Sequence, residues 1–361
     1  MYLITNRKIS KASGLKCLGS SPNIKGPNEL RLVKVNKLAK EWEVTPLDDQ
    51  LSTKRVNELK EHYHLELDLK KKWYGSLEVA CELFQKARKE KKSILFFAHG
   101  YNNDVSDILE TAFEIECLYN VIVVPFTWPA NGGGVISGTA AYLSDKSDAR
   151  ASAGAFNRAI GIIQRLHLLL TESLQKKHLQ TAFEKHPTNP NEAAALFTKL
   201  IETDCNIKIN LLCHSMGNYL LKHTFCSSEN NTSQLVFDNV LLIAADTNNE
   251  DHSNWVSKLD VRKRVYIVIN ENDSALRVSR IKPGEEQKAR LGHYLNKLNS
   301  ENALYIDLTD AQYVDSQHSY FKGNTVKKNE ELKILFKMMF NGESVEHLLS
   351  YQVDKNTYKP Q

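Results

Sequence analysis

The sequence has no long apolar run, no large net charge and no closely spaced cysteine pair. A transmembrane helix needs about 18 consecutive apolar residues, and the most apolar stretch, residues 162–170, is interrupted by Gln164, Arg165 and His167. The 47 basic and 43 acidic residues leave a net charge of +4 on 361 residues, which is too small to indicate a nucleic-acid-binding surface. We therefore expect neither a membrane-spanning segment nor a nucleic-acid partner.

Cysteine is sparse, and its spacing argues against the common disulfide, redox and metal frameworks. The six cysteines form no C-x-x-C motif and are scattered through a chain large enough to fold without crosslinks: Cys17, Cys81, Cys117, Cys205, Cys213 and Cys226. We expect reduced, buried thiols and no metal. The amino terminus turns polar after three apolar residues, so it lacks the apolar core of a secretory signal, and we expect a cytoplasmic protein.

What the sequence does contain is a regular alternation of short apolar runs and longer amphipathic segments. The apolar runs predict buried strands at residues 94–98, 121–126, 207–212, 240–244, 265–269 and 303–308. The amphipathic segments predict helices at residues 77–89, 106–119, 149–174, 191–202 and 330–339, the first two capped by Ser76 and Ser106. Because strands that alternate with helices form right-handed crossovers, we expect an α/β protein with a mainly parallel central sheet and helices on both faces.

Three parts of the chain fall outside this alternation. Short β-like runs predict antiparallel strands at the N-terminal edge of the sheet, at residues 2–4, 30–35 and 42–44. Residues 175–190 contain two prolines and resemble a linker, and we expect the wider region 175–205 to be an insertion or a cap element. Residues 343–361 are expected to be a C-terminal tail outside a main domain of residues 1–342.

A strand-to-helix turn at residues 213–217 carries the strongest chemical signal. Its residues, Cys213-His214-Ser215-Met216-Gly217, resemble the G-x-S-x-G nucleophile elbow, in which a strained turn exposes a serine hydroxyl at the carboxyl end of a strand. Gly217 supplies the second small residue of that pattern, while Cys213 replaces the first. The alternative is that Ser215 only caps the helix that follows.

A serine nucleophile needs hydrogen-bond donors where negative charge develops on the tetrahedral intermediate. One donor is the amide after the serine, here that of Met216, and the second comes from a loop after an earlier strand. The sequence His99-Gly100-Tyr101-Asn102 follows such a predicted strand. We expect the Tyr101 amide to be the second donor, with Gly100 allowing close approach and His99 holding the loop. The alternative is an ordinary turn.

Five histidines follow the serine in the chain and compete for the role of general base: His223, His252, His293, His318 and His347. His318 lies in a polar loop after a late predicted strand, where a histidine can lean over the strand ends, so we select it. For the acid that orients this base, Asp273 follows one buried strand and Asp246 follows the strand before it. We select Asp273, with Asp246 as the main alternative and Glu271 and Asp315 as lesser ones. A surface role for His318 and structural roles for the aspartates are the competing interpretations.

Seven segments, in this order, resemble the α/β-hydrolase-fold serine hydrolases, and in particular an uncharacterised, mostly bacterial branch of that family. They are Thr5-Asn6-Arg7, His99-Gly100-Tyr101-Asn102, Thr127-Trp128-Pro129 with Tyr142, Asp145 and Ser152, His214-Ser215-Met216-Gly217-Asn218, Ala244-Ala245-Asp246, Asn272-Asp273-Ser274-Ala275-Leu276 and His318-Ser319-Tyr320-Phe321. The resemblance implies a triad of Ser215, Asp273 and His318, with Tyr101 and Met216 at the oxyanion site. Members of this branch mostly lack a known substrate.

Residues and resemblance together predict a cofactor-free serine hydrolase of the esterase or lipase type, which cleaves an ester or related acyl bond through an acyl-enzyme. Its substrate would be a small-molecule or lipid acyl ester. Trp128 and Tyr142 are candidate pocket walls, although aromatic residues at strand ends are more often core. One alternative is an inactive hydrolase-fold subunit that binds a protein partner through residues 175–205 or the tail. Another is an acyltransferase or thioesterase that uses the same residues.

Overall fold

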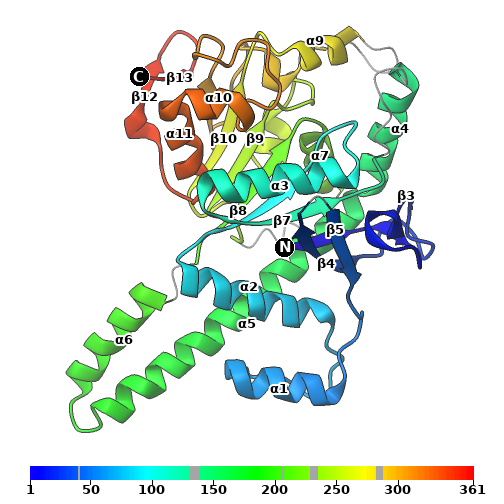
Figure 1. Ribbon diagram of the computed structural model, residues 1–361. Coiled ribbons are helices and arrows are strands. Elements are labelled where there is room, and N and C mark those ends of the chain that lie inside the picture. The colour runs from blue at the N-terminus through cyan, green and yellow to red at the C-terminus, as the bar shows by residue number, and fades with distance from the viewer. Residues whose placement is uncertain (40, 131–137, 205–206, 228–234, 282–287) are drawn as a thin grey trace.

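The computed structural model of the protein describes residues 1–39, 41–130, 138–204, 207–227, 235–281 and 288–361 (Figure 1). Its strands are β1 Tyr2–Thr5, β2 Arg7–Ile9, β3 Leu18–Pro22, β4 Arg31–Leu38, β5 Glu41–Pro46, β6 Ile94–Ala98, β7 Ile122–Thr127, β8 Ile209–His214, β9 Asn239–Ile243, β10 Arg264–Ile269, β11 Ala303–Asp307, β12 Leu349–Gln352 and β13 Thr357–Pro360. Its α-helices are α1 Thr53–Tyr63, α2 Gly75–Glu90, α3 Val105–Tyr119, α4 Gly138–Ala151, α5 Ala153–Lys185, α6 Pro190–Asp204, α7 Met216–Ser227, α8 Ser253–Val256, α9 Ser274–Ile281, α10 Gly323–Lys328 and α11 Glu330–Phe340. Short 3₁₀ turns lie at Gly14–Cys17, Leu291–His293 and Glu346–Leu348.

A central sheet of the described strands has the order β12-β13-β11-β10-β9-β8-β6-β7-β1-β4-β5. The strands from β13 to β1 in this order pair in parallel. At the N-terminal edge, β4 pairs antiparallel with both β1 and β5. The predicted α/β class, with a mainly parallel sheet and antiparallel N-terminal edge strands, is confirmed.

Both faces of the parallel strands are buried, because their side chains alternate between two hydrophobic clusters. On β6, Phe96 and Ala98 face one cluster, which α2, α5 and α7 cover, while Leu95 and Phe97 face the other, which α3 and α11 cover. This double burial explains why the strand sequences are continuous apolar runs. The carboxyl ends of the strands meet at one edge of the sheet, where functional groups of such folds gather.

Two predicted helix caps are wrong. α2 begins at Gly75, with Tyr74 at the cap position and no side-chain cap, so Ser76 lies inside the first turn. α3 is capped by Asp104, whose carboxylate accepts the Asp107 amide while the Asp107 carboxylate accepts the Asp104 amide. This reciprocal capping box places two carboxylates at the positive end of the helix dipole, and Ser106 is not needed as a cap.

The predicted linker at 175–190 is wrong over most of its length, because α5 continues to Lys185 and spans about 50 Å. α6 folds back along it, and His178 on α5 lies 3.3 Å from the Asp204 carboxylate at the end of α6. The two helices form an arm at the lower left of Figure 1. α6 ends just before β8 begins, at the opposite end of β8 from Ser215. The arm therefore does not cap the carboxyl end of the sheet.

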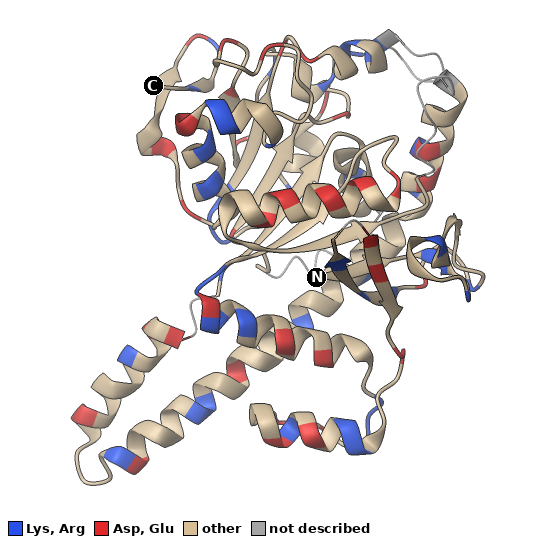
Figure 2. Ribbon diagram, in the orientation of Figure 1, with Lys and Arg blue, Asp and Glu red and all other residues tan. Residues whose placement is uncertain are grey.

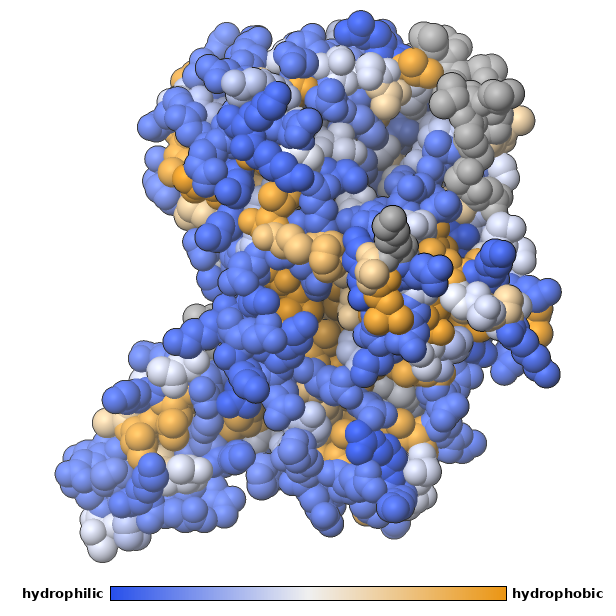
Figure 3. All heavy atoms as spheres, viewed as in Figure 1, coloured by the Kyte–Doolittle hydropathy of each residue, from blue (hydrophilic) through white to orange (hydrophobic). Residues whose placement is uncertain are grey.

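The surface of the arm and its neighbours is mixed in character. Basic and acidic residues are interspersed along α1, α2 and α5 (Figure 2). Apolar surface is also visible on the arm (Figure 3), and Leu179 and Phe183 on α5 are 43% and 51% exposed.

The segment 343–361, expected as a tail, contributes β12 and β13 to the sheet, and β13 pairs with β11 at Ile306 and Tyr358. Among the described cysteines, all free, Cys17, Cys81 and Cys213 are buried, but Cys117 and Cys226 are exposed, which corrects the expectation that the thiols are buried. Cys205 lies outside the described residues. Within the described part of the chain, no helix combines the length and apolar character needed to cross a bilayer.

Candidate active site

The chain turns sharply between β8 and α7, at Ser215. β8 ends at His214, α7 begins at Met216, and Ser215 between them has φ of 53°. This left-handed conformation is unfavourable by roughly 1–2 kcal/mol for a residue with a β carbon. The strained turn places the serine at the carboxyl end of a buried parallel strand, in the position that the elbow pattern predicts.

Hydrogen bonds from neighbouring segments hold this turn. The Ser215 amide donates to the Ile243 carbonyl at the end of β9 (3.0 Å), and the Ser215 carbonyl accepts from the Asp246 amide (3.2 Å). The Asn218 side-chain amide donates to the carbonyls of Cys213 (3.0 Å) and Ser215 (3.1 Å). Cys213 is fully buried, so a cysteine is accommodated where the pattern has glycine.

Two glycines allow the loop after β6 to pack directly against the turn. A β carbon on Gly100 would lie 2.8 Å from the β carbon of Ser215 and 3.3 Å from its Oγ. A β carbon on Gly217 would lie 2.4 Å from the Ala98 carbonyl oxygen. Any larger residue would push the loop away, so the loop and the serine are in contact because these positions are glycine.

The structure brings His318 and Asp273 together. His318 Nδ1 lies 2.7 Å from Asp273 Oδ2, and the aspartate is fully buried. Asp273 Oδ1 accepts the amides of Ala275 (2.9 Å) and Leu276 (3.0 Å), in the first turn of α9. Because an ionised carboxylate only accepts hydrogen bonds, we assign the imidazole proton to Nδ1, which leaves a lone pair on Nε2.

The loop that carries the histidine is fixed from the sheet side. The Asn270 side chain donates to the carbonyls of Asp315 (3.0 Å) and Gln317 (3.2 Å). The buried Tyr320 hydroxyl donates to the Val268 carbonyl at 2.9 Å. These bonds, from β10 and the residue after it, orient the loop toward the carboxyl ends of the strands.

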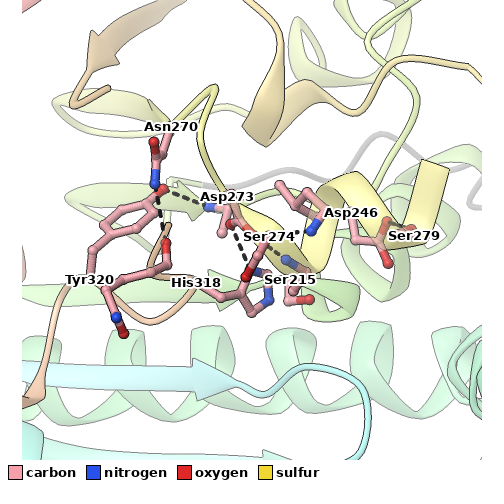
Figure 4. A network of polar contacts seen from close by, with 12 residues as sticks. Ser215, Asp246, Asn270, Asp273, Ser274, Ser279, His318 and Tyr320 are labelled. Atoms are coloured by element: carbon pink, nitrogen blue, oxygen red, sulfur yellow. Dashed lines mark hydrogen bonds and ion pairs between the residues drawn. The ribbon is translucent and has the colours of Figure 1, made fainter. Parts of the chain in front are cut away.

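His214 links this loop to the serine turn. Its Nε2 lies 3.2 Å from the His318 carbonyl, and the two imidazole rings are 4.7 Å apart. Burial, followed by the influence of His318, lowers the pKa of His214 well below its usual value, so the ring is neutral. Figure 4 shows Ser215, His318 and Asp273 gathered at one place on the sheet edge.

His99 supports the loop after β6. Its ring stacks on Trp128 with centroids 3.7 Å apart, and its Nδ1 lies 2.8 Å from the Gly100 carbonyl. Burial, and to a lesser extent the nearby Arg7, lowers the pKa of His99 to about 3. His99 is therefore neutral, with its Nδ1 proton directed to the loop.

Acid should destabilise the protein partly through His99. Folding lowers the pKa of His99, so protonating this ring costs free energy in the folded protein. The stability that the protein has above pH 6.5 is therefore partly lost as the pH falls from 6.5 toward 3. Between pH 7.5 and pH 5 we expect His99 alone to reduce the free energy of unfolding by about 2 kcal/mol. Urea unfolding of wild type and His99→Gln at both pH values measures this. If both proteins lost the same free energy of unfolding between pH 7.5 and pH 5, His99 would not be a source of the acid sensitivity.

Asp246, the alternative acid, is engaged elsewhere. Its Oδ1 lies 3.2 Å from Arg290 Nε and accepts the Ser279 hydroxyl at 2.6 Å, and its Oδ2 accepts the Tyr142 hydroxyl at 2.9 Å. Asp246 and Arg290 are each 3% exposed. The structure therefore makes Asp246 the partner of a buried arginine, beside the serine turn (Figure 4).

Breaking this buried ion pair should lower the stability of the folded protein. Arg290→Ala leaves the Asp246 carboxylate buried without its cation, and we expect the free energy of unfolding to fall by about 3–5 kcal/mol. Arg158→Ala is the control, because Arg158 pairs with Glu29 at 3.6 Å but is 56% exposed. Urea denaturation should show a change below about 1 kcal/mol for the control. A similarly small change for Arg290→Ala would show that the pair is not a structural element.

The other sequence candidates have different local surroundings. The His223 ring meets the Tyr219 ring of α7 edge to face, and His252 contacts the Asn249 carbonyl and the Tyr305 hydroxyl. His293 and His347 lie in 3₁₀ turns. Among the acids, Glu271 accepts the Leu295 amide at 3.4 Å, and Asp315 is exposed.

The two candidate pocket walls are both interior residues. Trp128 is fully buried against His99, and Tyr142 is 3% exposed. Trp128 packs on His99, and the Tyr142 hydroxyl bonds to Asp246, so both side chains contact other side chains of the protein. In the described residues, no group of three or more His, Cys, Asp or Glu side chains is arranged to hold a metal ion.

Four residues around the site have no role assigned from the sequence: Asp145, Asn218, Ser279 and Arg290. Asp145 and Asn218 lie in segments that carry the family resemblance, and Asn218 directly follows the elbow motif, so its position could have indicated its role. Arg290 and Ser279 meet Asp246 from separate segments, with no spacing that marks them. Their partnership is visible only in the folded chain.

A family model described as "Alpha/beta hydrolase of unknown function (DUF900)" matches residues 78–171 and 175–333, more than two thirds of the chain. The matched residues include Ser215, Asp273 and His318, together with the loop at 99–102. No curated protein and no solved structure matches the chain.

Proposed function

The chain belongs to this family of alpha/beta hydrolases, and on that premise we propose that it is a serine hydrolase with Ser215 as nucleophile, His318 as general base and Asp273 as the acid that orients the base. The observation that carries the proposal is the 2.7 Å contact between His318 Nδ1 and the fully buried Asp273. It occurs beside a serine held in a strained strand-to-helix turn.

In the proposed mechanism, Ser215 Oγ attacks the acyl carbon of the substrate while His318 Nε2 takes the hydroxyl proton. Asp273 holds the imidazole in the required tautomer and stabilises the imidazolium. His318 then returns the proton to the leaving group, which departs and leaves an acyl-enzyme. Water, activated by the same histidine, hydrolyses that ester.

The negative oxygen of each tetrahedral intermediate needs two donors. The Met216 amide is one, because the first amides of a helix have no acceptor within the helix. The Tyr101 amide is the other, since Gly100 brings its loop into contact with Ser215. Backbone donors fixed in this way stabilise the developing charge without reorganisation.

An acyl ester, either a small molecule or a lipid, is the proposed substrate class. The test is turnover of nitrophenyl esters of increasing acyl length, with labelling of the folded protein by a fluorophosphonate probe. We expect hydrolysis of at least one ester, and labelling that the hydrolysed ester slows by competition. A folded protein that neither hydrolyses esters nor reacts with the probe would be an inactive subunit instead.

A further inference from the structure

Helix α4 packs one face against the loop that follows β6. Tyr142 and Asp145 are three residues apart, so they lie on the same face of α4, and they are 3% and 2% exposed. The Tyr142 ring meets the Tyr101 ring edge to face, with centroids 5.4 Å apart. Asp145 Oδ2 accepts the Asn102 amide proton at 3.2 Å. α4 therefore contacts the residue that supplies the proposed oxyanion donor and the residue directly after it.

The same helix is connected to the nucleophile turn. The Tyr142 hydroxyl donates to Asp246 Oδ2 at 2.9 Å, and the Asp246 backbone amide donates to the Ser215 carbonyl at 3.2 Å. The other oxygen of Asp246 is fixed by Ser279 and Arg290. One helix face thus joins the two backbone segments that flank the proposed oxyanion hole.

The loop held by Asp145 is strained. Asn102 has φ of 59°, a left-handed conformation that is unfavourable without support from its surroundings. The amide of this residue is the one that Asp145 holds. An oxyanion donor acts only when its N–H points at the developing charge. A small rotation of this loop would therefore reduce the stabilisation of the transition state more than it reduces the affinity for the substrate.

We propose that Asp145 and Tyr142 are positioning residues, through which α4 holds the Tyr101 amide in the direction that a tetrahedral intermediate on Ser215 requires. The proposal rests on the serine-hydrolase function given above. Asp145 acts through Asn102, and Tyr142 acts through the Tyr101 ring and Asp246.

Substitutions of Asp145 separate this role from general packing. Asp145→Ala removes the acceptor of the Asn102 amide, whereas Asp145→Asn keeps a side-chain oxygen that can accept the same proton. We expect kcat for ester hydrolysis to fall about 30-fold in Asp145→Ala with KM nearly unchanged, and to recover mostly in Asp145→Asn. Asp148→Ala, which removes a carboxylate from the next turn of α4, is the control and should keep the wild-type kcat.

Substitutions of Tyr142 separate its ring contact from its hydroxyl contacts. Tyr142→Phe keeps the ring against Tyr101 but loses the hydroxyl contacts with Asp246 and Ser279, and Tyr142→Leu loses the ring contact as well. We expect kcat to decrease in the order wild type, Tyr142→Phe, Tyr142→Leu, again with little change in KM. Equal kcat for all three proteins would remove Tyr142 from the proposal.

Hydrogen exchange gives a readout that does not depend on turnover. In Asp145→Ala, the peptide that covers residues 99–103 should exchange at least about tenfold faster, while β8 and β9 keep their protection. If Asp145→Ala loses protection throughout the protein, the kcat of Tyr142→Phe replaces this measurement. A kcat below that of wild type with little change in KM supports the positioning role, and an unchanged kcat contradicts it.

The outcomes distinguish this proposal from the proposed function. A wild-type protein without hydrolysis and without fluorophosphonate labelling overturns the function itself. An active wild type whose Asp145→Ala variant keeps both its kcat and its exchange rate at residues 99–103 overturns the positioning role alone.

Discussion

Ser215→Ala is expected to lower kcat for ester hydrolysis by about 10⁴-fold to 10⁶-fold, and to abolish labelling by a fluorophosphonate. The variant lacks the only atom that can form the acyl-enzyme in the proposed mechanism, so nothing else at the site replaces it. The remaining rate would come from the backbone donors and from substrate binding alone. Steady-state kinetics on a nitrophenyl ester measure the loss.

The matched control is Ser274→Ala, which removes another hydroxyl from the same end of the sheet. Ser274 Oγ donates to the Ser316 carbonyl at 3.1 Å. We expect Ser274→Ala to stay within about tenfold of the wild-type kcat, because this hydroxyl only supports the histidine loop. Labelling of Ser215→Ala at the wild-type rate would place the nucleophile elsewhere.

Asp273→Asn is expected to lower kcat by about 10⁴-fold with little loss of folding stability. The asparagine amide fills the same volume, but it favours the tautomer in which Nδ1 of His318 is the acceptor. His318 Nε2 would then carry the proton, and it could not accept one from Ser215. The hydrolysis rate of the variant, with its melting temperature, gives the measurement.

Asp315→Asn is the control for this substitution. Asp315 lies in the histidine loop, was a candidate for the same role, and is exposed, with only its backbone carbonyl held by Asn270. Its kcat should match wild type. If Asp315→Asn and Asp273→Asn lost the same amount of activity, the 2.7 Å contact of Asp273 would not be the catalytic one.

The sheet could be predicted from the sequence because its central strands are buried on both faces. A continuous apolar run such as Ile94–Ala98 carries that signal in itself. The predicted run at 207–212 differs from the observed strand, Ile209–His214, because the elbow pattern assigns Cys213 and His214 to the turn, although both are buried and still pair with β9. The ends of the strands therefore depend on burial in the folded protein, which the local sequence does not show.

Helix ends and edge pairing could not be predicted to the same degree. Residues 175–185 are rich in polar side chains, and they become helical because His178 and Ala182 are buried on the continuing α5. The pairing of β13 with β11 joins residues about fifty positions apart in the chain. Neither feature has a local pattern, since each depends on contacts with distant segments.

The candidate site shows the same division. The chain order proposes Ser215, Asp273 and His318 as candidates, each after a buried strand, and in the structure Asp273 lies 2.7 Å from His318. The sequence favours Asp273 over Asp246 only by its place after the later strand. What separates the two aspartates in the structure is Arg290, which reaches Asp246 from a separate segment.

Peptide mass spectrometry after fluorophosphonate treatment shows whether the Ser215 hydroxyl is the reactive group. We expect one adduct per chain, on the peptide that contains His214, Ser215 and Met216, and no adduct when His318 is replaced by alanine. An adduct on any other residue, or an intact folded protein that remains unmodified, would exclude Ser215 as the nucleophile.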